Sequence, residues 1–432
     1  MHSYPQRWLN GAIILNSQRS SPDATIEPLW NLLQVSDVLD LELASALAGD
    51  TGPDSRPDAT KVAYVAPLGP KPVLAWEPQR MFWPSRIACG AEEEPPSATG
   101  STLRVRALPL LRGFARPPMS WFSGTGLSVL QRLLSQTADS RNSPLICTVP
   151  FFASVAELWP GPVIYWLTDL IAAYPSANRR RVEQLDRRLC SVSTLVCPNS
   201  SRLAEYLVQR AGCDPAKIHI LPNATRGANV LPAPPNGPMA PPNSIASIPR
   251  PFAGIIGNLA GNMDWLLLER TIALTPWLHW VFVGPTVMQI ADASQRAARQ
   301  TVMNNPRTHF LGRQPYGELA AFARSFDVAV LPYKRCEPTY SGSSTRFYEH
   351  LAACRPMVAT PGLEELNRKT PLLTLVNTAE EAVVALEKLR ACDFNDGLLG
   401  ERWEQSRHGT WETRASSLRD ALARRLSSPN GA

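Results

Sequence analysis

Long apolar runs are absent from this chain: none of its hydrophobic stretches reaches the length of a transmembrane helix. The apolar part of the N-terminal stretch MHSYPQRWLNGAIILNSQ is too short and too polar for a secretory signal. Histidine and cysteine are scarce, with 6 and 8 residues, and the cysteines form no C-x-x-C pair and no cluster with histidine. We therefore expect a cytoplasmic protein without a metal site, a cofactor or a disulfide framework.

Strong charge is also lacking. Charged residues make up 19% of the chain and the net charge is +6. The basic residues fall mainly in ANRRRVEQLDRRL and LRVRALPLLRGFARPP, which we interpret as solvated surfaces, and we expect no nucleic-acid partner. In the second segment the arginines of 104–116 alternate with leucines ahead of Trp121 and Phe122. Peripheral contact with an anionic inner-membrane surface is the alternative interpretation.

Short apolar runs that end in Gly, Pro, Asn or Asp recur along the chain, with helical patterns between them. Continuous apolar runs of this length, alternating with helices, predict α/β architecture with parallel sheets covered on both faces. The predicted strands lie at 61–67, 144–150, 161–169, 194–199, 217–223, 252–258, 278–285, 307–313, 327–333, 356–360 and 372–377.

A proline-rich stretch at 231–251 separates the two halves of this pattern and predicts an extended linker. The sequence thus predicts a first domain at 1–230 and a second at 252–408, followed by a final helical segment at 409–432. In that last helix Trp411, Ala415, Leu418, Leu422 and Leu426 recur at spacings of three and four, which predicts one apolar face.

Glycine follows several strands of the second half. Open parallel sheets bind ligands outside the carboxyl ends of their strands, and glycine there permits close approach of the backbone. Any one of these glycines is explained by turn formation alone, but their recurrence favours a binding edge. The strand ends carry Gly257–Asn258, Gly284–Pro285, Gly312–Arg313 and Pro332–Tyr333.

The stretch SGSSTRFYE lies between two of these strands and opens a helix near Ser344 or Thr345. Its small residues are Ser341, Gly342, Ser343 and Ser344. They supply hydroxyls and N–H groups at the positive end of the helix, which suits an anion. Arg346 adds a cation, and Glu349, one turn on, can accept hydrogen bonds from a vicinal diol such as a ribose. A capped helix with a surface Arg–Glu pair is the structural alternative.

The continuation STRFYEHLAACRPMVAT resembles the nucleotide-sugar signature of GT-B glycosyltransferases, in particular the family 4-like "glycosyltransferase group 1" and its teichuronic-acid-type subgroup. Arg346 stands for the usual Lys and Glu349 for the usual Glu. FAGIIGNLAGNMDWLLLERTIALTPWLHWVFVGP and HFLGRQPYGELAAFARSFDVAVLPY look like other segments of the same family. The likeness extends from about residue 60 to the C-terminus.

This resemblance implies two Rossmann-like domains that face a cleft, with an acceptor-binding first domain and a nucleotide-sugar-binding second domain. The last helix would cross back onto the first domain. Glu349 would hold the donor ribose and Arg346 the diphosphate. The backbone near Gly312–Arg313 would meet the base, and Gly257–Asn258 would approach the phosphates.

The predicted activity is transfer of a hexosyl-type sugar from a UDP- or GDP-sugar to an acceptor hydroxyl, in cell-surface polysaccharide or other glycoconjugate biosynthesis. The acceptor would be a glycan, a lipid-linked molecule or a small molecule. The resemblance implies retention of configuration without a metal or a protein base. If a base exists, Asp169 after the strand at 161–169 is the candidate, with a helix cap as its structural alternative.

Two departures from the family pattern leave alternatives open. Ser341 stands where relatives carry the first Glu of a Glu-x7-Glu pair, and GNLAGNMDW lacks their usual basic pair. Lys334, Arg335 or Arg313 would then share the phosphate charge with Arg346. The alternatives are a catalytically weak nucleotide-binding partner subunit and a sugar-nucleotide epimerase.

Overall fold

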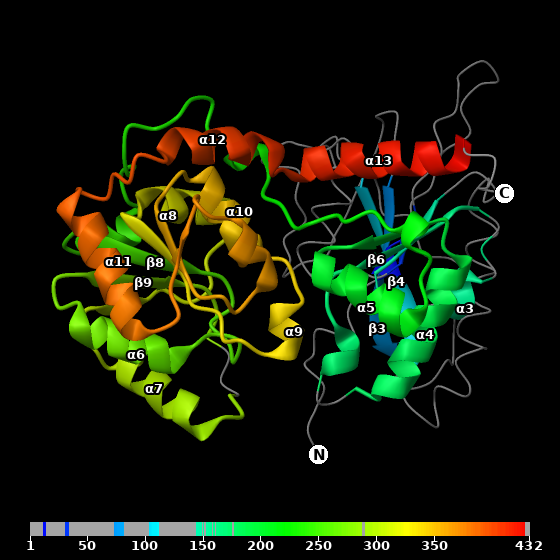
Figure 1. The fold of residues 1–432 in the computed structure, drawn as a ribbon, viewed down its shortest axis with the longest axis horizontal. Helices are drawn as coiled ribbons and strands as arrows, with labels where there is room; N and C mark the ends of the chain where they lie inside the picture. Colours follow the sequence, from blue (N-terminus) through cyan, green and yellow to red (C-terminus); the bar gives the residue numbers. More distant parts are fainter. Residues whose placement is uncertain are drawn as a thin grey trace. The chain divides into compact units, whose positions relative to one another are not determined.

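The computed structural model describes residues 144–427, except 149, 151–152, 158, 160, 175–176 and 287–289, and the backbone of four strands nearer the N-terminus. The strand predicted at 61–67 lies outside the described residues. The chain divides into two compact units, and these are Met1–Pro222 with Trp411–Ala432 and Asn223–Thr410 (Figure 1). No helix in the described part of the chain is long and apolar enough to cross a membrane.

The second unit is built on a six-stranded sheet in which every neighbouring pair of strands is parallel, as predicted. Its spatial order is β10-β9-β8-β11-β12-β13. Counted from the first strand of this sheet the order is 3-2-1-4-5-6, that of a dinucleotide-binding doubly wound fold. The strands are β8 (Phe252–Ile256), β9 (His279–Val283), β10 (Thr308–Phe310), β11 (Val328–Leu331), β12 (Met357–Ala359) and β13 (Thr374–Leu375).

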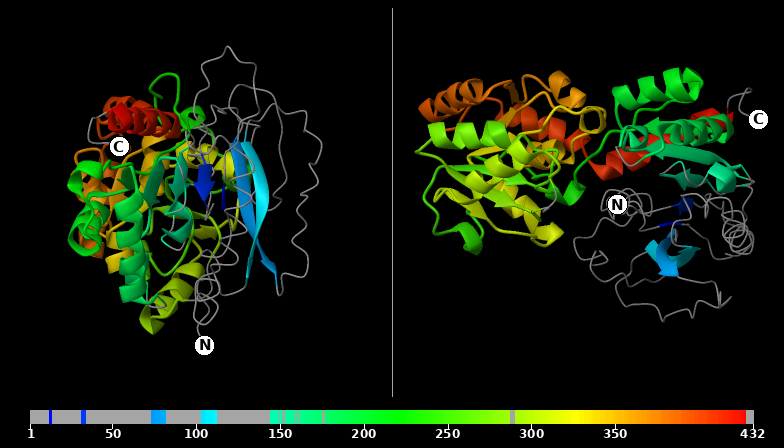
Figure 2. Two further views of the ribbon diagram at one scale, coloured as in Figure 1. Left: turned by 90° about the vertical axis from the view of Figure 1, so that its right-hand side faces the viewer. Right: turned by 90° about the horizontal axis from the view of Figure 1, so that it is seen from below.

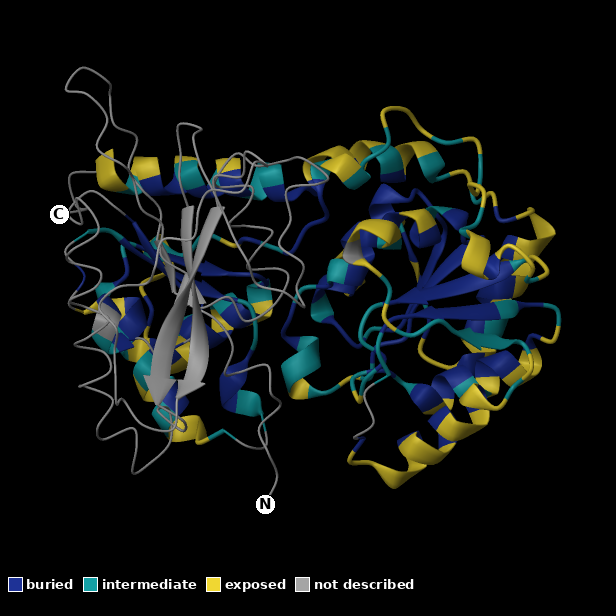
Figure 3. Cartoon of the chain, turned by 180° about the vertical axis from the view of Figure 1, so that it is seen from behind, coloured by how far each residue is buried: buried dark blue, intermediate teal, exposed yellow. Residues whose placement is uncertain are grey.

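Helices cover both faces of this sheet (Figures 1 and 2). Ala253 and Ile255 of β8 pack in one core with side chains of α6, α7 and α11, whereas Phe252 and Ile256 pack in another with Phe322 of α8. The central strands are buried, the edge strands β10 and β13 are partly exposed, and the outer helix faces are exposed (Figure 3). The helices are α6 (Trp265–Leu274), α7 (Ala293–Met303), α8 (Leu319–Ser325), α9 (Glu337–Tyr340), α10 (Thr345–Ala352), α11 (Ala379–Ala391) and α12 (Leu399–His408).

The first unit contains a parallel sheet in the order β2-β5-β6-β7. A second, three-stranded sheet pairs β1 with β3 antiparallel and β3 with β4 parallel, which the sequence did not predict. The strands are β1 (Ala12–Ile13), β2 (Asn31–Leu33), β3 (Val73–Met81), β4 (Leu103–Leu111), β5 (Leu145–Cys147), β6 (Val163–Leu167) and β7 (Leu195–Pro198). The α-helices described in this unit ahead of the C-terminal one are α3 (Ala153–Ala156), α4 (Arg179–Val192) and α5 (Ser201–Ala211).

The run predicted as a strand at 217–223 is not a strand. Only Ile218 forms an isolated parallel bridge, to Val196 of β7. The run then continues into the second unit at Asn223. Proline at 222 removes a backbone donor, so a ladder cannot be continued there.

The proline-rich stretch 231–251 belongs to the second unit rather than standing apart from both. Ile245 is fully buried in the core that contains Phe322, and Met239 N–H donates to the Arg324 carbonyl at 2.9 Å. Residues 223–230, which the sequence pattern places in the first domain, also belong to the second unit. An isoleucine that reaches the core explains why this stretch is packed although it has no strand.

The C-terminal helix, α13 (Trp411–Ser427), belongs to the first unit. Trp411 is buried edge-on against Trp166 of β6, with ring centroids 6.2 Å apart. Ser417 Oγ lies 3.0 Å from His219 Nε2. Four of the five predicted apolar positions are buried, but Leu426 is 50% exposed near the helix end, so the predicted face is one turn too long.

Candidate nucleotide-sugar site

The second unit has one topological switch point, between the neighbouring strands β8 and β11. From there the chain connects to β9 on one side and to β12 on the other, and the carboxyl ends of strands at such a point are where open α/β sheets bind ligands. The loops that follow these two strands are tied together. Met263 and Tyr333 form an antiparallel bridge, and Lys334 N–H donates to the Asn262 carbonyl at 2.8 Å. The predicted residues Gly257, Asn258 and Tyr333 therefore lie at this edge.

Three predicted glycines line the carboxyl ends of β8, β9 and β10. Gly257, Gly284 and Gly312 have φ angles of +109°, +145° and +65°. Gly284 N–H donates to the Gly312 carbonyl at 2.9 Å, and a Cβ on Gly284 would lie 2.0 Å from the Gly257 carbonyl oxygen. A side chain is therefore excluded at Gly284 by both backbone conformation and space.

Arg346 lies in the first turn of α10 and reaches this edge. Its side chain is 8% exposed, and its Nη2 donates to the carbonyl of Asn258. The guanidinium carbon lies 5.1 Å from the centroid of the Tyr333 ring, and a Cβ on Gly257 would lie 2.8 Å from Nε. Nη1 is buried and has no hydrogen-bond partner among the described residues. Since a buried polar group left unpaired is costly, this nitrogen is placed to receive an anionic ligand.

The loop before α10 is held more firmly than the sequence predicts. Ser344 caps the helix by accepting from Phe347 N–H at 3.1 Å, and its hydroxyl also bonds Tyr333 Oη at 2.9 Å. Ser343 Oγ donates to Glu365 at 2.8 Å. Thr345 Oγ1 accepts from Asn223 Nδ2 at 3.2 Å. The hydroxyls expected to be available for a ligand therefore fix the loop instead.

Glu365, which no motif or spacing marks in the sequence, lies at the N-terminal end of α10. It comes from the short 3-10 helix Glu364–Arg368 and is 5% exposed. Besides Ser343, it accepts from Ser344 N–H at 2.9 Å and Tyr348 Oη at 2.7 Å, and it lies 3.4 Å from Lys369 Nζ. A carboxylate already occupies the positive helix end, so the cation of Arg346 is left as the main anion-attracting group there.

Glu349 lies one turn after Arg346 on α10 and is 6% exposed. Its Oε2 accepts from Asn229 Nδ2 at 3.1 Å. The next residue, His350, is fully buried, and burial together with the nearby Arg346 cation lowers its pKa to about 3. His350 is therefore neutral at physiological pH and cannot serve as a general acid.

The remaining predicted residues are more dispersed. Ser341 is buried in the loop before α10, and Gly342 lies within it. Arg313 is exposed after β10. Lys334 pairs with Asp292 at 3.1 Å, and the Arg335 guanidinium lies 4.6 Å from the Tyr340 ring centroid. Asp169 belongs to the first unit, half-buried after β6, where its carbonyl accepts from Ile171 N–H at 2.9 Å.

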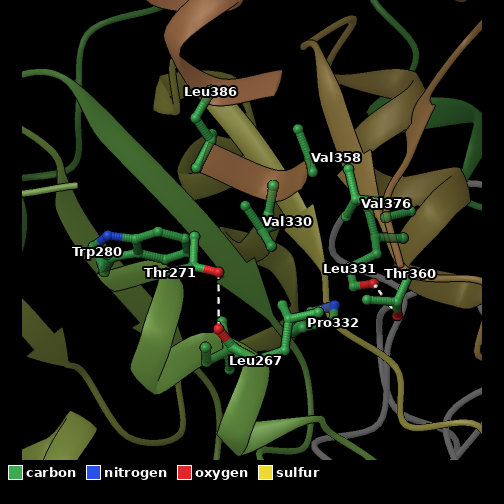
Figure 4. A pocket seen from close by; sticks show the side chains of 13 residues that line it. Leu267, Thr271, Trp280, Val330, Leu331, Pro332, Val358, Thr360, Val376 and Leu386 are labelled. Carbon is green, nitrogen blue, oxygen red and sulfur yellow. Dashed lines mark hydrogen bonds between the residues drawn. The ribbon is translucent and has the colours of Figure 1, made fainter. Parts of the chain in front are cut away.

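A small void elsewhere in the second unit is not a candidate site. It measures about 10 Å³ and lies between the sheet and helices α6 and α11 (Figure 4). Its lining is apolar except for two threonines, and both are already paired: Thr271 of α6 donates to the Leu267 carbonyl at 2.8 Å and Thr360 to the Tyr333 carbonyl at 2.7 Å. Such a space holds at most one water and is part of the core.

Comparisons with known proteins agree with this architecture. No protein-family model matches the chain. In sequence it is 22% identical over 246 residues to TuaH of Bacillus subtilis (strain 168), which is provisionally named a teichuronic acid biosynthesis glycosyltransferase. That match covers 54% of this chain and 59% of the relative, so the chain spans less than two thirds of it.

Solved glycosyltransferase structures show the same fold. Sucrose-phosphate synthase from Thermosynechococcus elongatus aligns with a TM-score of 0.59 at 16% identity, over 81% of this chain and 88% of that one. HepE from Anabaena, solved in complex with UDP and glucose, aligns with a TM-score of 0.55 at 11% identity, over 74% and 86%. These likenesses confirm the predicted fold class and the resemblance on which it was based.

Proposed function

Starting from a GT-B fold and a sequence similar to a glycosyltransferase, we propose that this chain transfers a sugar from a nucleotide-sugar donor to an acceptor hydroxyl. The observation that carries the proposal is Arg346 Nη1, a buried cationic nitrogen at the switch point of the sheet that has no hydrogen-bond partner in the part of the chain that the structure describes. Gly257 and Asn258 bring the backbone to the same place, and Glu349 lies one turn further along α10. HepE, which shares the fold, is a UDP-binding protein in its solved complex, and this supports UDP as the nucleotide to test first.

The chemistry requires stabilisation of the departing nucleoside diphosphate. Arg346 supplies a fixed positive charge where the negative charge of the leaving group develops, and one such preorganised donor is worth roughly 2.7–4 kcal/mol of barrier. Glu349 would orient the donor through the ribose diol. The proposal includes retention of configuration, as the family resemblance implies, with the leaving phosphate accepting the acceptor proton. Because the charge is met by Arg346, we propose that the reaction proceeds without a metal.

The cellular setting is a further part of the proposal. The name of TuaH supports a role in cell-surface polysaccharide biosynthesis, with a glycan, lipid-linked or small-molecule acceptor. Such work would take place in the cytoplasm, with peripheral contact at the inner membrane through the arginines and leucines of 104–116. Residues 104–111 of this segment belong to β4.

A second candidate function is a nucleotide-binding partner subunit of low activity. Two observations favour it: Ser341 stands where the family carries the first Glu of its pair, and the N-terminal end of α10 is occupied by Glu365. Both observations mean that fewer polar groups are available to contact the donor sugar.

The two candidates, together with the epimerase alternative, are separated by one experiment. The protein is incubated with radiolabelled UDP-sugars and GDP-sugars, with Arg346→Met as the control for any contaminating activity. Release of nucleoside diphosphate that is lost in the variant supports the transferase. Saturable binding without release supports the partner subunit, and a changed sugar stereocentre supports the epimerase. Absence of binding to every donor at millimolar concentration would refute the proposed function.

A further inference from the structure

The short segment at residues 223–229, here called the crossing segment, is the first part of the second unit. It follows directly on Pro222, where the chain leaves the first unit. Thr225 N–H donates to the Gly409 carbonyl at 3.0 Å, and Thr225 forms a parallel bridge with Thr410. Thr410 is the last residue before the chain returns to the first unit. The two covalent connections between the units are therefore hydrogen-bonded to each other.

The same crossing segment is bonded to the loop that opens α10. Asn223 is 3% exposed. Its backbone N–H donates to Ser343 Oγ at 3.0 Å, and its side-chain Nδ2 donates to the Ser343 carbonyl at 2.9 Å and to Thr345 Oγ1 at 3.2 Å. Three bonds from one buried residue fix the position of the first turn of α10, which carries Arg346.

Asn229, at the end of the crossing segment, is bonded to Glu349. Its Nδ2 group donates one hydrogen to Glu349 Oε2 and one to Thr225 Oγ1, each at 3.1 Å. Its backbone carbonyl accepts from Arg324 Nη2 at 2.8 Å. Both hydrogens of the amide are thus in use and its backbone is held, so Asn229 presents a rigid donor to the carboxylate.

We propose that the crossing segment is part of the donor-binding apparatus, with Asn229 as a positioning residue that orients the Glu349 carboxylate toward a vicinal diol. The inference rests on the proposed function, because it assigns a ribose to Glu349. A carboxylate accepts about four hydrogen bonds, so Glu349 can hold Asn229 and a diol together. The bond from Asn229 fixes the plane of the carboxylate before the nucleotide arrives, which lowers the entropic cost of binding.

The proposal also predicts a physical link between the donor and the connection between the units. A diol bound to Glu349 would restrict the motion of the carboxylate and of the Asn229 amide that donates to it, and Asn229 also donates to Thr225 of the crossing segment. Nucleotide binding should therefore stabilise the Thr225–Gly409 backbone bond. This would be seen as slower amide exchange of the crossing segment, an effect that a purely structural role for Asn229 does not require.

The test measures how strongly the protein prefers a ribonucleotide to its 2′-deoxy analogue. Calorimetry gives the affinities of UDP and 2′-deoxy-UDP, or of the guanosine pair if only GDP binds. The variants are Asn229→Ala, Glu349→Gln and the double variant, and the control is Asn243→Ala, an exposed asparagine of the second unit. Thermal unfolding reports whether each variant is folded. The double variant completes a cycle that isolates the interaction of the two residues.

The wild-type protein should bind the ribonucleotide with an affinity about 10-fold or more above that for the 2′-deoxy analogue, because a hydrogen bond to a charged group contributes that much. Asn229→Ala should reduce that preference by about 3- to 10-fold, and Glu349→Gln should remove most of it. The double variant should show no further loss, because both changes act on one contact. An unchanged preference in Asn229→Ala, or additive losses in the double variant, would overturn the inference while leaving the proposed function intact.

Hydrogen exchange of the wild-type protein keeps the inference testable should Asn229→Ala not fold. Saturating nucleotide should slow exchange in a peptide covering 223–230 more than in a peptide from α11, which lacks any contact with Glu349 among the bonds described. If nucleotide slowed exchange by the same factor in both peptides, or in neither, the inference would be overturned. If neither UDP nor GDP binds, the proposed function fails first and this inference fails with it.

Discussion

The unpartnered Nη1 of Arg346 makes the sharpest prediction. Replacement of Arg346 by Met removes the charge and all five N–H donors but keeps a flexible apolar side chain of similar length against Tyr333. The change also leaves the Asn258 carbonyl without its side-chain donor. We expect a modest loss of stability, about 1 kcal/mol for one missing hydrogen bond, and a folded protein.

The effect on binding should be larger and should depend on the phosphates. A hydrogen bond to a charged group contributes about 1.5–3 kcal/mol, which corresponds to roughly a 10- to 150-fold change in affinity. Arg346 is 8% exposed, so solvent screens this contribution little. Affinity for UDP should fall by that factor in Arg346→Met, while affinity for uridine should change by less than about 3-fold, since uridine carries no charge for the guanidinium.

Calorimetric titration of both proteins with UDP, UMP and uridine measures these changes. Arg270→Met is the matched control, because Arg270 is an exposed residue of α6 that pairs with Glu380 on the surface. The control should leave all three affinities unchanged. An equal loss of affinity for UDP and uridine in Arg346→Met would show that the residue supports the fold of the site without contacting phosphate, and the reasoning from its unpartnered nitrogen would be refuted.

Three further predictions concern stability. Gly284→Ala should lower the unfolding free energy by more than about 2 kcal/mol in denaturant titrations, because the φ of Gly284 is +145° and the new Cβ would meet the Gly257 carbonyl. Gly261→Ala is the control and should change the unfolding free energy little, because the space around Gly261 is open. Glu365→Ala should lower the unfolding free energy by about 3 kcal/mol in the same measurement, because the buried donors of Ser344 and Tyr348 lose their acceptor. Glu365→Gln should cost less than half as much, and similar losses in the two variants would contradict the role of Glu365 as an acceptor. Burial raises the pKa of Asp186 from 3.8 to about 6. The stability that its protonation contributes is therefore complete below about pH 4 and is lost as the pH rises through 6. The melting temperature of the wild type should fall relative to that of Asp186→Asn between about pH 4 and 7, and parallel curves of melting temperature against pH would contradict the shift.

The parts of the site that follow a strand could be read from the sequence. The apolar runs at 252–258, 278–285 and 327–333 contain β8, β9 and β11, and their terminal glycines or Tyr333 lie at the carboxyl edge as predicted. The start of α10 was readable too, because Ser344 is a preferred N-cap followed by an amphipathic segment. These features depend on residues close in the chain, where local propensity acts directly.

The partners of those residues could not be read in the same way. Glu365 contacts Ser344 across 21 positions, and Asn223 contacts Ser343, and Asn229 contacts Glu349, each across 120 positions. No periodicity or spacing marks such residues, because their roles arise when distant segments meet. The hydroxyls of Ser343 and Ser344 show this: a hydroxyl next to a helix start has no visible partner in the sequence, and the fold supplies one.

The sequence by itself determined the two α/β halves, the parallel pairing of the strands in the second sheet and the place of Arg346 and Glu349 one turn apart on a capped helix. Local patterning is sufficient for these, because hydrophobic period and turn chemistry act over a few residues. Only the tertiary structure decided that the end of α10 already holds a carboxylate, that 231–251 packs on the second unit, and that the crossing segment is bonded to Glu349. Those outcomes depend on which buried polar groups find partners once the chain is compact, and that is set by the whole fold.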